Sequence, residues 1–258
     1  MNIVVCVKQV PDTWSEKKLD ASDSTLDRAA TDPVMNEMDE YAVEEALKLQ
    51  EAHGGEVTIL CMGPDAATET VRKALSMGAD KAIHVIDEAL HGSDAVATSL
   101  VLAKALGTTE FDLVILGSES SDARMSVVPA MLAERLGLPQ LTFAKEVTVD
   151  ATSVSIKRLT DDGYQAVEAS LPAVVSVVEK INEPRYPSFK GIMAAKNKPV
   201  DQVTASDLGL ADQVGWSGAR QEITNVAKAP ERQAGEKFED DGTGYEKIVA
   251  FLEKLKVI

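Results

Sequence analysis

Three short loops in the chain have residue types that could hold the phosphate of a nucleotide. They span residues 8–13, 62–64 and 117–122, and each follows an apolar run that predicts a β-strand. Small residues let backbone N–H groups approach a phosphate, and the third loop leads to a predicted helix N-terminus near Ser126, which favours an anion. A plain strand-to-helix connection also explains this loop, so the residues alone favour nucleotide binding only slightly.

Residue patterns for other chemistries are missing from the sequence. It has no G-x-x-x-x-G-K-[ST] phosphate loop, and the run from 117 to 120 does not match the G-x-S-x-G pattern of a nucleophilic serine. The three histidines lack the spacing of metal ligands, so we expect no metal site. Glu44 and Glu45 lie on a predicted exposed helix face, where we expect both carboxylates to be solvated. Without a catalytic group of residues, we expect a protein that is not an enzyme.

The composition fits one large α/β domain, alone or with an extended tail. The chain has 258 residues, of which 45% are hydrophobic, and its 42 acidic and 26 basic residues give a net charge of −16. This charge opposes non-specific binding to nucleic acid. No apolar run approaches the roughly 20 residues that span a bilayer, and the N-terminus enters a strand pattern at once, so we expect no signal peptide. We expect a cytosolic protein with reduced core thiols at Cys6 and Cys61.

Apolar runs alternate with helical periods along the chain. The predicted strands are residues 3–7, 57–62, 82–86, 113–116 and 173–178. The predicted helices are residues 38–50, 65–78, 93–107 and 126–136, with Asn36 and Ser93 as N-caps. Strands joined by single helices indicate right-handed crossovers and a parallel sheet. The predicted fold class is a doubly wound, mostly parallel α/β sheet, Rossmann-like or adenine-nucleotide-hydrolase-like.

The second half of the chain adds a hairpin and an arm to this core. Residues 150–169 predict a β-hairpin that turns at Asp161-Asp162-Gly163. From about residue 227 the composition becomes polar, and residues 243–257 then predict a short amphipathic helix that needs a surface to pack on. The predicted domains are a nucleotide-binding domain, residues 1–226, and an extended C-terminal arm, residues 227–258.

A basic patch stands out on this acidic chain. Residues 185–198 contain Arg185, Lys190, Lys196 and Lys198 and no acidic residue. An ordinary solvated loop explains such a patch, and so does a docking surface for an acidic partner, which would accelerate encounter.

Several motifs have the order and spacing of a known family. They are Ile156-x-Arg158, Asp161-Asp162-Gly163, Gln165-x-Val167, Pro172 with Val174-Val175-Ser176, Asn182-Glu183-Pro184-Arg185-Tyr186 and Gly191-Ile192-Met193. Nearer the N-terminus, Val7-Lys8-Gln9-Val10-Pro11-Asp12, Asn36-x-x-Asp39 and Ala42-Val43-Glu44-Glu45-Ala46 follow the same family pattern. Over essentially its whole length the chain resembles the β subunit of electron-transfer flavoproteins.

The resemblance implies an electron carrier. The β subunit of this family pairs with an α subunit in a heterodimer with one FAD, held mainly by the α subunit. The heterodimer accepts electrons from dehydrogenases such as acyl-CoA dehydrogenases and passes them to a membrane quinone oxidoreductase. The arm would cross to the α subunit. The alternatives are a stand-alone nucleotide-binding protein of the universal-stress type and an adenine-nucleotide hydrolase, and neither needs the 182–200 loop or the arm.

The resemblance also assigns residues to three sites. The structural cofactor AMP would contact Cys6, Asn36, Glu37, Met38, Asp39, Met62, Asp122, Ala123, Arg124, Met125, Ser126, Val127, Val128 and Pro129. Thr13 and Trp14 would lie near the FAD. The recognition loop, residues 182–200, would dock dehydrogenases through Arg185, Tyr186, Phe189, Lys190, Ile192 and Met193, with Phe189 as the apolar anchor. Residues 122–129 lack the Gly, Thr and Gln that the family often carries there, so the identity of the nucleotide stays open.

Overall fold

The computed structural model describes residues 1–232, 234–235 and 237–258, and it divides into two units. Unit 1 spans Met1–Glu222 and unit 2 spans Ile223–Ile258, so the division falls a few residues before the predicted boundary at 227. In the part of the chain that is described, no helix is both long and apolar enough to cross a membrane.

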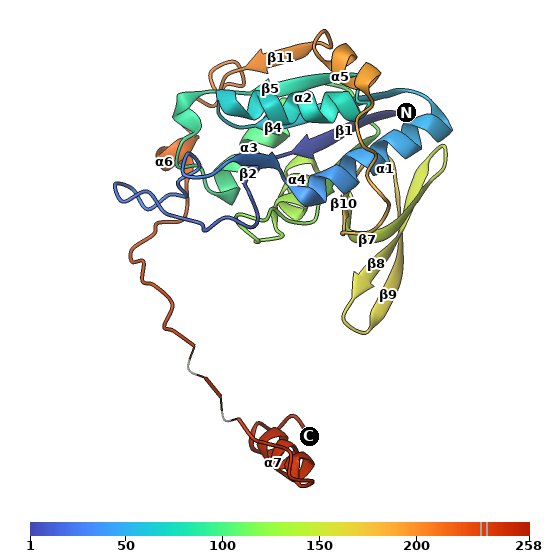
Figure 1. The fold of residues 1–258 in the computed structure, drawn as a ribbon. Coiled ribbons are helices and arrows are strands. Elements are labelled where there is room, and N and C mark those ends of the chain that lie inside the picture. The colour runs from blue at the N-terminus through green and yellow to red at the C-terminus, as the bar shows by residue number, and fades with distance from the viewer. Residues whose placement is uncertain (233, 236) are drawn as a thin grey trace. The chain divides into compact units, whose positions relative to one another are not determined.

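Unit 1 is built on a sheet that has nine strands among the described residues, in the order β11-β5-β4-β1-β6-β10-β7-β8-β9 (Figure 1). The strands are β1 Asn2–Val7, β4 Glu56–Met62, β5 Lys81–Val85, β6 Leu113–Gly117, β7 Gln140–Val149, β8 Ser153–Thr160, β9 Gly163–Ser170, β10 Ala173–Val177 and β11 Val200–Val203. Pairing is parallel from β11 through β7, while β8 and β9 are antiparallel. Two short strands, β2 Gln9–Pro11 and β3 Pro33–Met35, form a separate antiparallel pair.

Helices cover both faces of this sheet. They are α1 Glu37–His53, α2 Thr68–Met77, α3 Ala95–Leu106, α4 Val128–Leu136, α5 Phe189–Ala195 and α6 Gly215–Gly218, with 3₁₀ turns η1 Asp65–Ala67 and η2 Glu88–Leu90. Apolar residues of α1 and α2 join one buried cluster and those of α3 and α4 join another. Successive residues of β1 enter the two clusters alternately, because side chains of a strand point to opposite faces. The predicted doubly wound α/β fold is therefore confirmed.

Two predicted helix starts are wrong. The N-cap of α3 is Asp94, whose carboxylate accepts a hydrogen bond from the Ala97 N–H at 2.9 Å, whereas Ser93 Oγ accepts from the Gly215 N–H at 2.8 Å. Helix α4 begins at Val128 because Ser126 has a left-handed backbone with φ 54°, which a right-handed helix does not allow.

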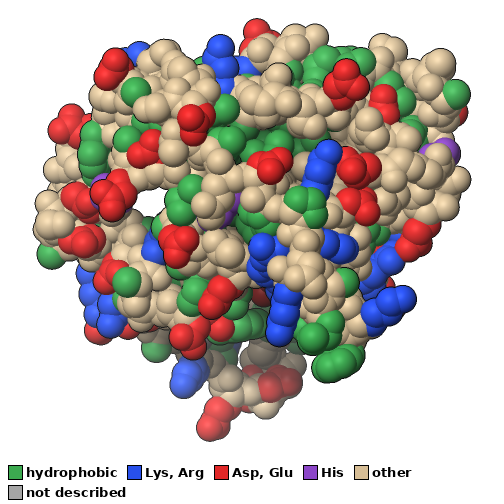
Figure 2. Space-filling view, turned by 90° about the horizontal axis from the view of Figure 1, so that it is seen from above, with side chains coloured by type: hydrophobic (Ala, Val, Ile, Leu, Met, Phe, Trp, Pro, Cys, Tyr) green, Lys and Arg blue, Asp and Glu red, His purple; other side chains and the backbone are tan. Residues whose placement is uncertain are grey.

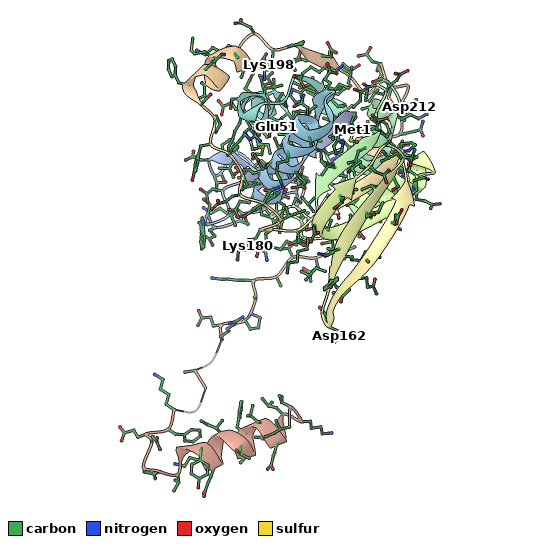
Figure 3. The ribbon with its side chains drawn as sticks, turned by 90° about the vertical axis from the view of Figure 1, so that its right-hand side faces the viewer. Met1, Glu51, Asp162, Lys180, Lys198 and Asp212 are labelled. Atoms are coloured by element: carbon green, nitrogen blue, oxygen red, sulfur yellow. The ribbon has the colours of Figure 1, made fainter. Side chains whose placement is uncertain are left out.

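The β-hairpin is confirmed, but the sequence pattern does not predict strands β2, β3, β7 and β11 or helices α5 and α6. β8 and β9 pair through Thr160 and Gly163 across the predicted turn, whose tip is labelled at Asp162 in Figure 3. β7 mixes exposed and buried positions without a clean alternation, and β11 is short and polar. The seven-residue helix α5 lies inside the predicted recognition loop, which is therefore partly regular.

Unit 2 consists of an extended segment and helix α7 Gly244–Lys254, which lies within the predicted helical range. Its apolar residues Ile248, Phe251 and Leu255 are exposed, and the helix has no buried residue. Isolated helices shorter than about 12–15 residues are marginal in water, so the apolar side of α7 needs a surface to pack on.

We expect unit 1 to fold without unit 2, because unit 1 has its own sheet and buried clusters. Deletion of residues 223–258 should leave one cooperative thermal transition, with Tm changed by less than about 3 °C. Circular dichroism checks this outcome on the purified chain. A loss of the cooperative transition would show that the arm is part of the core.

Candidate functional site

The three predicted loops meet at one edge of the sheet. β1 lies between β4 and β6 and pairs in parallel with both, placing Val7 beside Cys61 and Cys6 beside Leu116. The carboxyl ends of these strands therefore lie side by side, and the loops that follow them line the same edge. Open parallel sheets bind ligands at such an edge.

Asn36 joins the elements of this edge. It is 1% exposed, and its Nδ2 donates to Asp39 Oδ1 at 3.0 Å and to the Glu119 carbonyl at 2.9 Å. Its Oδ1 accepts from the Ser121 N–H at 3.0 Å, and its own N–H donates to the Lys8 carbonyl. One side chain thus fixes the loop after β6 to the start of α1, directly beside the exit of β1.

Asn36 lies at the predicted N-cap position of α1, but its side chain does not cap the helix. Its Oδ1, the acceptor that would cap the helix, takes the Ser121 N–H instead, while its Nδ2 donates to Asp39 and Glu119. Asn36 stabilises the contact between two loops rather than the helix end.

Asp39 is the second member of this buried polar pair. Its Oδ2 accepts from the Lys8 N–H at 2.8 Å, and a Cβ placed on Gly117 would lie 2.6 Å from its Oδ1, so only glycine fits there. Burial raises the pKa of Asp39 to about 7, and the hydrogen bonds from Asn36 and Lys8 oppose that rise. Burial likewise raises the pKa of the Cys6 thiol on β1, with a smaller contribution from Asp39, as is typical of an unreactive core cysteine.

Asp122 organises the loop after β6 from the other side. Its carboxylate, 1% exposed, pairs with Lys8 Nζ at 2.8 Å and with Arg28 Nη2 at 2.8 Å. Burial alone would raise its pKa, but the charge of Lys8 and the hydrogen bonds from Lys8 and Ser120 lower it to about 2, with a further contribution from Arg28. The sequence pattern does not single out Lys8 or Arg28, because they lie 114 and 94 positions from Asp122.

The residues at this edge fit a ligand with phosphate and hydroxyl groups. Among the described residues, the Thr13 and Ser121 hydroxyl oxygens are buried without a hydrogen-bond partner, and Lys8 Nζ lies beside the same loop. The left-handed Arg124, φ 50°, and Ser126 bend the loop out of the helix. The first turn of α4 contains Pro129, which has no N–H, so a phosphate would depend more on hydroxyls and Lys8 than on the helix end.

The other predicted cofactor residues are distributed around this edge. Met62 ends β4, Glu37 and Met38 open α1, and Ala123, Arg124 and Met125 are exposed on the loop, whereas Val127 and Val128 are partly buried where α4 begins. Thr13 and Trp14 follow β2, and the Trp14 side chain is 93% exposed. An indole so exposed suits contact with another molecule.

Glu44 and Glu45 are buried, so the prediction that they are solvated is wrong. Arg185 Nε and Nη2 donate to the two carboxylate oxygens of Glu44 at 2.7 and 3.0 Å, and Asn182 Nδ2 donates to Glu45 Oε2 at 2.9 Å. A third acid, Glu51, accepts from Arg185 Nη1 at 2.6 Å. The partners lie far away in the sequence, which is why helix periodicity alone predicted an exposed acidic face. The sequence did offer one sign of this pairing, because residues 185–198 are basic and contain no acidic residue although the chain as a whole is very acidic.

The predicted basic patch is partly neutralised by these contacts. Arg185 is paired with Glu44 and Glu51, and the Lys198 ammonium donates to the carbonyls at the end of α2. Lys190 and Lys196 are exposed. Figure 2, from above, shows acidic, basic and apolar side chains interspersed over this face of the molecule.

Apolar side chains project from the same segment. Phe189 is 80% exposed and Tyr186 is 96% exposed, with Ile192 and Met193 also exposed. Exposed apolar groups gathered in one segment are typical of a protein interaction surface.

Comparison with known proteins assigns the chain. A family model described as the electron transfer flavoprotein domain matches residues 23–208. The electron transfer flavoprotein subunit beta of Mycobacterium leprae is 52% identical over 264 residues, covering 100% of this chain and 99% of that protein. The chain belongs to the electron transfer flavoprotein β-subunit family. The subunit beta of Megasphaera elsdenii is 36% identical, with 93% of each chain covered, and the Caffeyl-CoA reductase-Etf complex subunit CarD of Acetobacterium woodii is 34% identical, with 92% and 91% covered.

Family membership confirms the predicted resemblance and an electron-transfer role. An electron transfer flavoprotein β subunit is a component of a carrier. Neither the universal-stress alternative nor the hydrolase alternative finds support in these relatives.

Asn36→Ala should lower the free energy of unfolding by about 2 to 3 kcal/mol, because it leaves the Ser121 N–H and the Glu119 carbonyl without their buried partner. Urea denaturation measures the change. Asn225→Ala, in the exposed arm, is the matched control and should change nothing. An Asn36→Ala protein as stable as wild type would contradict a structural role for this contact.

The raised pKa of Asp39 predicts a pH dependence of stability. Between about pH 4 and pH 7 the folded state keeps a proton that the unfolded state has lost, so the free energy of unfolding falls as pH rises. In Asp39→Asn, which mimics the protonated acid, this contribution is absent. From about pH 5 to pH 8, wild type should lose roughly 3 kcal/mol relative to Asp39→Asn in urea titrations. A constant difference would show that Asp39 ionises normally.

Proposed function

We propose that this chain forms a heterodimer with an electron transfer flavoprotein α subunit and helps to hold one FAD, bound mainly by that subunit. Support comes from the family and from α7, whose exposed apolar side lacks a surface of its own unit to cover it. FAD supplies the redox chemistry when bound. This chain would cover one side of the flavin through Thr13 and Trp14, excluding water from it.

The observation that carries the nucleotide part of the proposal is the buried edge around Asn36. We infer that AMP lies over the carboxyl ends of β1, β4 and β6 as a structural cofactor. The orphaned Ser121 hydroxyl and the ammonium of Lys8 suit its polar groups, and Arg124 is exposed beside them. Asn36 would hold the phosphate loop, residues 117–127, in place for the ligand. A ligand that binds only the folded state stabilises it by mass action.

The recognition segment, residues 182–200, supports the proposed partners of the heterodimer. Its exposed aromatic and aliphatic residues with Lys190 and Lys196 nearby have the form of a docking surface with a charged rim. We propose acyl-CoA and related dehydrogenases as electron donors and a membrane quinone oxidoreductase as acceptor, with the carrier in the cytoplasm. The name of the Acetobacterium woodii relative includes a reductase of a CoA thioester, which supports partners that act on CoA thioesters.

Co-expression with the α subunit tests this function. The purified complex should be yellow, with one FAD per heterodimer, and acid extraction followed by chromatography should release near-stoichiometric AMP. Deletion of residues 223–258 should strongly weaken assembly, because it removes α7 and with it the packing of this helix on the partner. A colourless chain that forms no complex would refute the carrier role, and a second FAD in place of AMP would refute the nucleotide assignment.

Phe189→Ala should weaken donor docking by about 2 kcal/mol, near 30-fold, because it removes the proposed apolar anchor. Stopped-flow reduction of the heterodimer by an acyl-CoA dehydrogenase measures this effect as a function of protein concentration. Tyr164→Ala, which removes another exposed aromatic side chain, on the hairpin, serves as the control. Flavin content and spectrum should stay unchanged in both variants. Unaltered rates in Phe189→Ala at every concentration would remove this segment from docking.

A further inference from the structure

The recognition segment is fastened to α1 at its N-terminal end. The Arg185 guanidinium donates hydrogen bonds to both oxygens of the buried Glu44 carboxylate, and the Arg185 backbone N–H donates to Glu44 Oε2 at 3.1 Å. Asn182 adds bonds from Nδ2 to Glu45 Oε2 and to the Tyr41 carbonyl at 3.0 Å. A forked guanidinium–carboxylate contact fixes direction as well as distance.

The other end of the segment is fastened to α2. Arg72 Nη1 donates to the Ala195 carbonyl at 2.7 Å and to the Lys198 carbonyl at 2.8 Å. Lys198 Nζ in turn donates to three carbonyls at the end of α2, at 2.6 to 3.1 Å. Figure 3 labels Glu51 of α1, which also accepts a hydrogen bond from Arg185. It also labels Lys198, near the opposite end of the segment.

Close packing locates α5 between these two attachments. A Cβ on Gly191 would lie 2.5 Å from the Ser76 carbonyl oxygen, so the backbone of α5 touches the last turn of α2. A pocket of about 350 Å³ lies beside this contact and is lined in part by Arg185, Tyr186 and Lys198. Seven helical residues would not stay ordered alone, so these contacts must hold α5 in shape.

We infer that Glu44 is a positioning residue for partner docking, acting through Arg185 to hold α5 with Phe189 outward. The inference rests on the proposed function of the segment. Glu44 itself is 6% exposed, so it acts on the partner only through the segment that it holds. A segment ordered before encounter loses less entropy on binding, which strengthens docking without a new contact.

The first test is amide hydrogen exchange on the full-length chain in complex with the α subunit. Glu44→Gln removes the charge but keeps the shape, and residues 186–195 should exchange about tenfold faster, as their local opening becomes easier. Glu40→Gln is the matched control, because Glu40 lies on the same helix but pairs with Lys73 of α2. Its exchange over 186–195 should match wild type. Unchanged exchange in Glu44→Gln would overturn the inference.

The second test separates positioning from general stability. With an acyl-CoA dehydrogenase as donor, Glu44→Gln should raise the KM for the heterodimer about tenfold and leave kcat and the flavin spectrum unchanged. In the Phe189→Ala background the same substitution should add less than about twofold, because the anchor it positions is gone. Equal effects in both backgrounds, or a lowered kcat with unchanged KM, would overturn the inference.

Two further outcomes separate this inference from the function on which it rests. If Phe189→Ala is silent, the docking surface itself is refuted and the inference falls with it. If Phe189→Ala weakens docking while Glu44→Gln does not, only the positioning role is refuted. Should Glu44→Gln fail to fold, Glu44→Asp replaces it, since its shorter side chain draws the carboxylate away from the Arg185 guanidinium and should give the same rise in KM.

Discussion

The buried polar pair of Asn36 and Asp39 is the contact on which the proposed nucleotide edge depends. Asn36 is hydrogen-bonded both to the loop after β6 and to Lys8 at the end of β1. Asp39 accepts a hydrogen bond from the Lys8 N–H at the same place. A buried amide or carboxylate is tolerated only when its hydrogen bonds are made, so this pair specifies one arrangement of the loops. The phosphate loop therefore takes its shape from α1 as well as from its own residues.

The same helix also supports the second functional region. Asp39, Glu44 and Glu45 are buried acids of α1, and each is hydrogen-bonded to a segment distant in sequence. Removal of either partner would leave an unpaired buried group, which is strongly unfavourable. The proposed cofactor edge and the proposed docking segment thus share one support, helix α1. The docking segment depends on Glu44 and Glu45, which the amphipathic pattern assigned to solvent.

The sequence predicts the parallel core well, because apolar strands of β1, β4, β5 and β6 alternate with helices bounded by glycine. It also brings Asn36, Asp39 and the 117–122 loop to one edge, since the carboxyl ends of parallel strands meet. It does not predict which hydrogen bonds these residues make within the chain. Asn36 resembles a helix cap locally, but its partners lie 83 and 85 positions away. Glu44 resembles a solvated acid until Arg185, 141 positions away, folds against it. Hydrogen bonds and ion pairs between residues distant in sequence determine the site. Local periodicity contains no information about such pairs.

A crystal structure of the complex purified with the α subunit tests the central claim most directly. We expect density for one AMP over the carboxyl ends of β1, β4 and β6, beside Ser121 and Lys8, with the Asn36 bonds to Glu119 and Ser121 intact. Density for a nucleotide elsewhere on this chain, or a phosphate loop detached from Asn36, would contradict it.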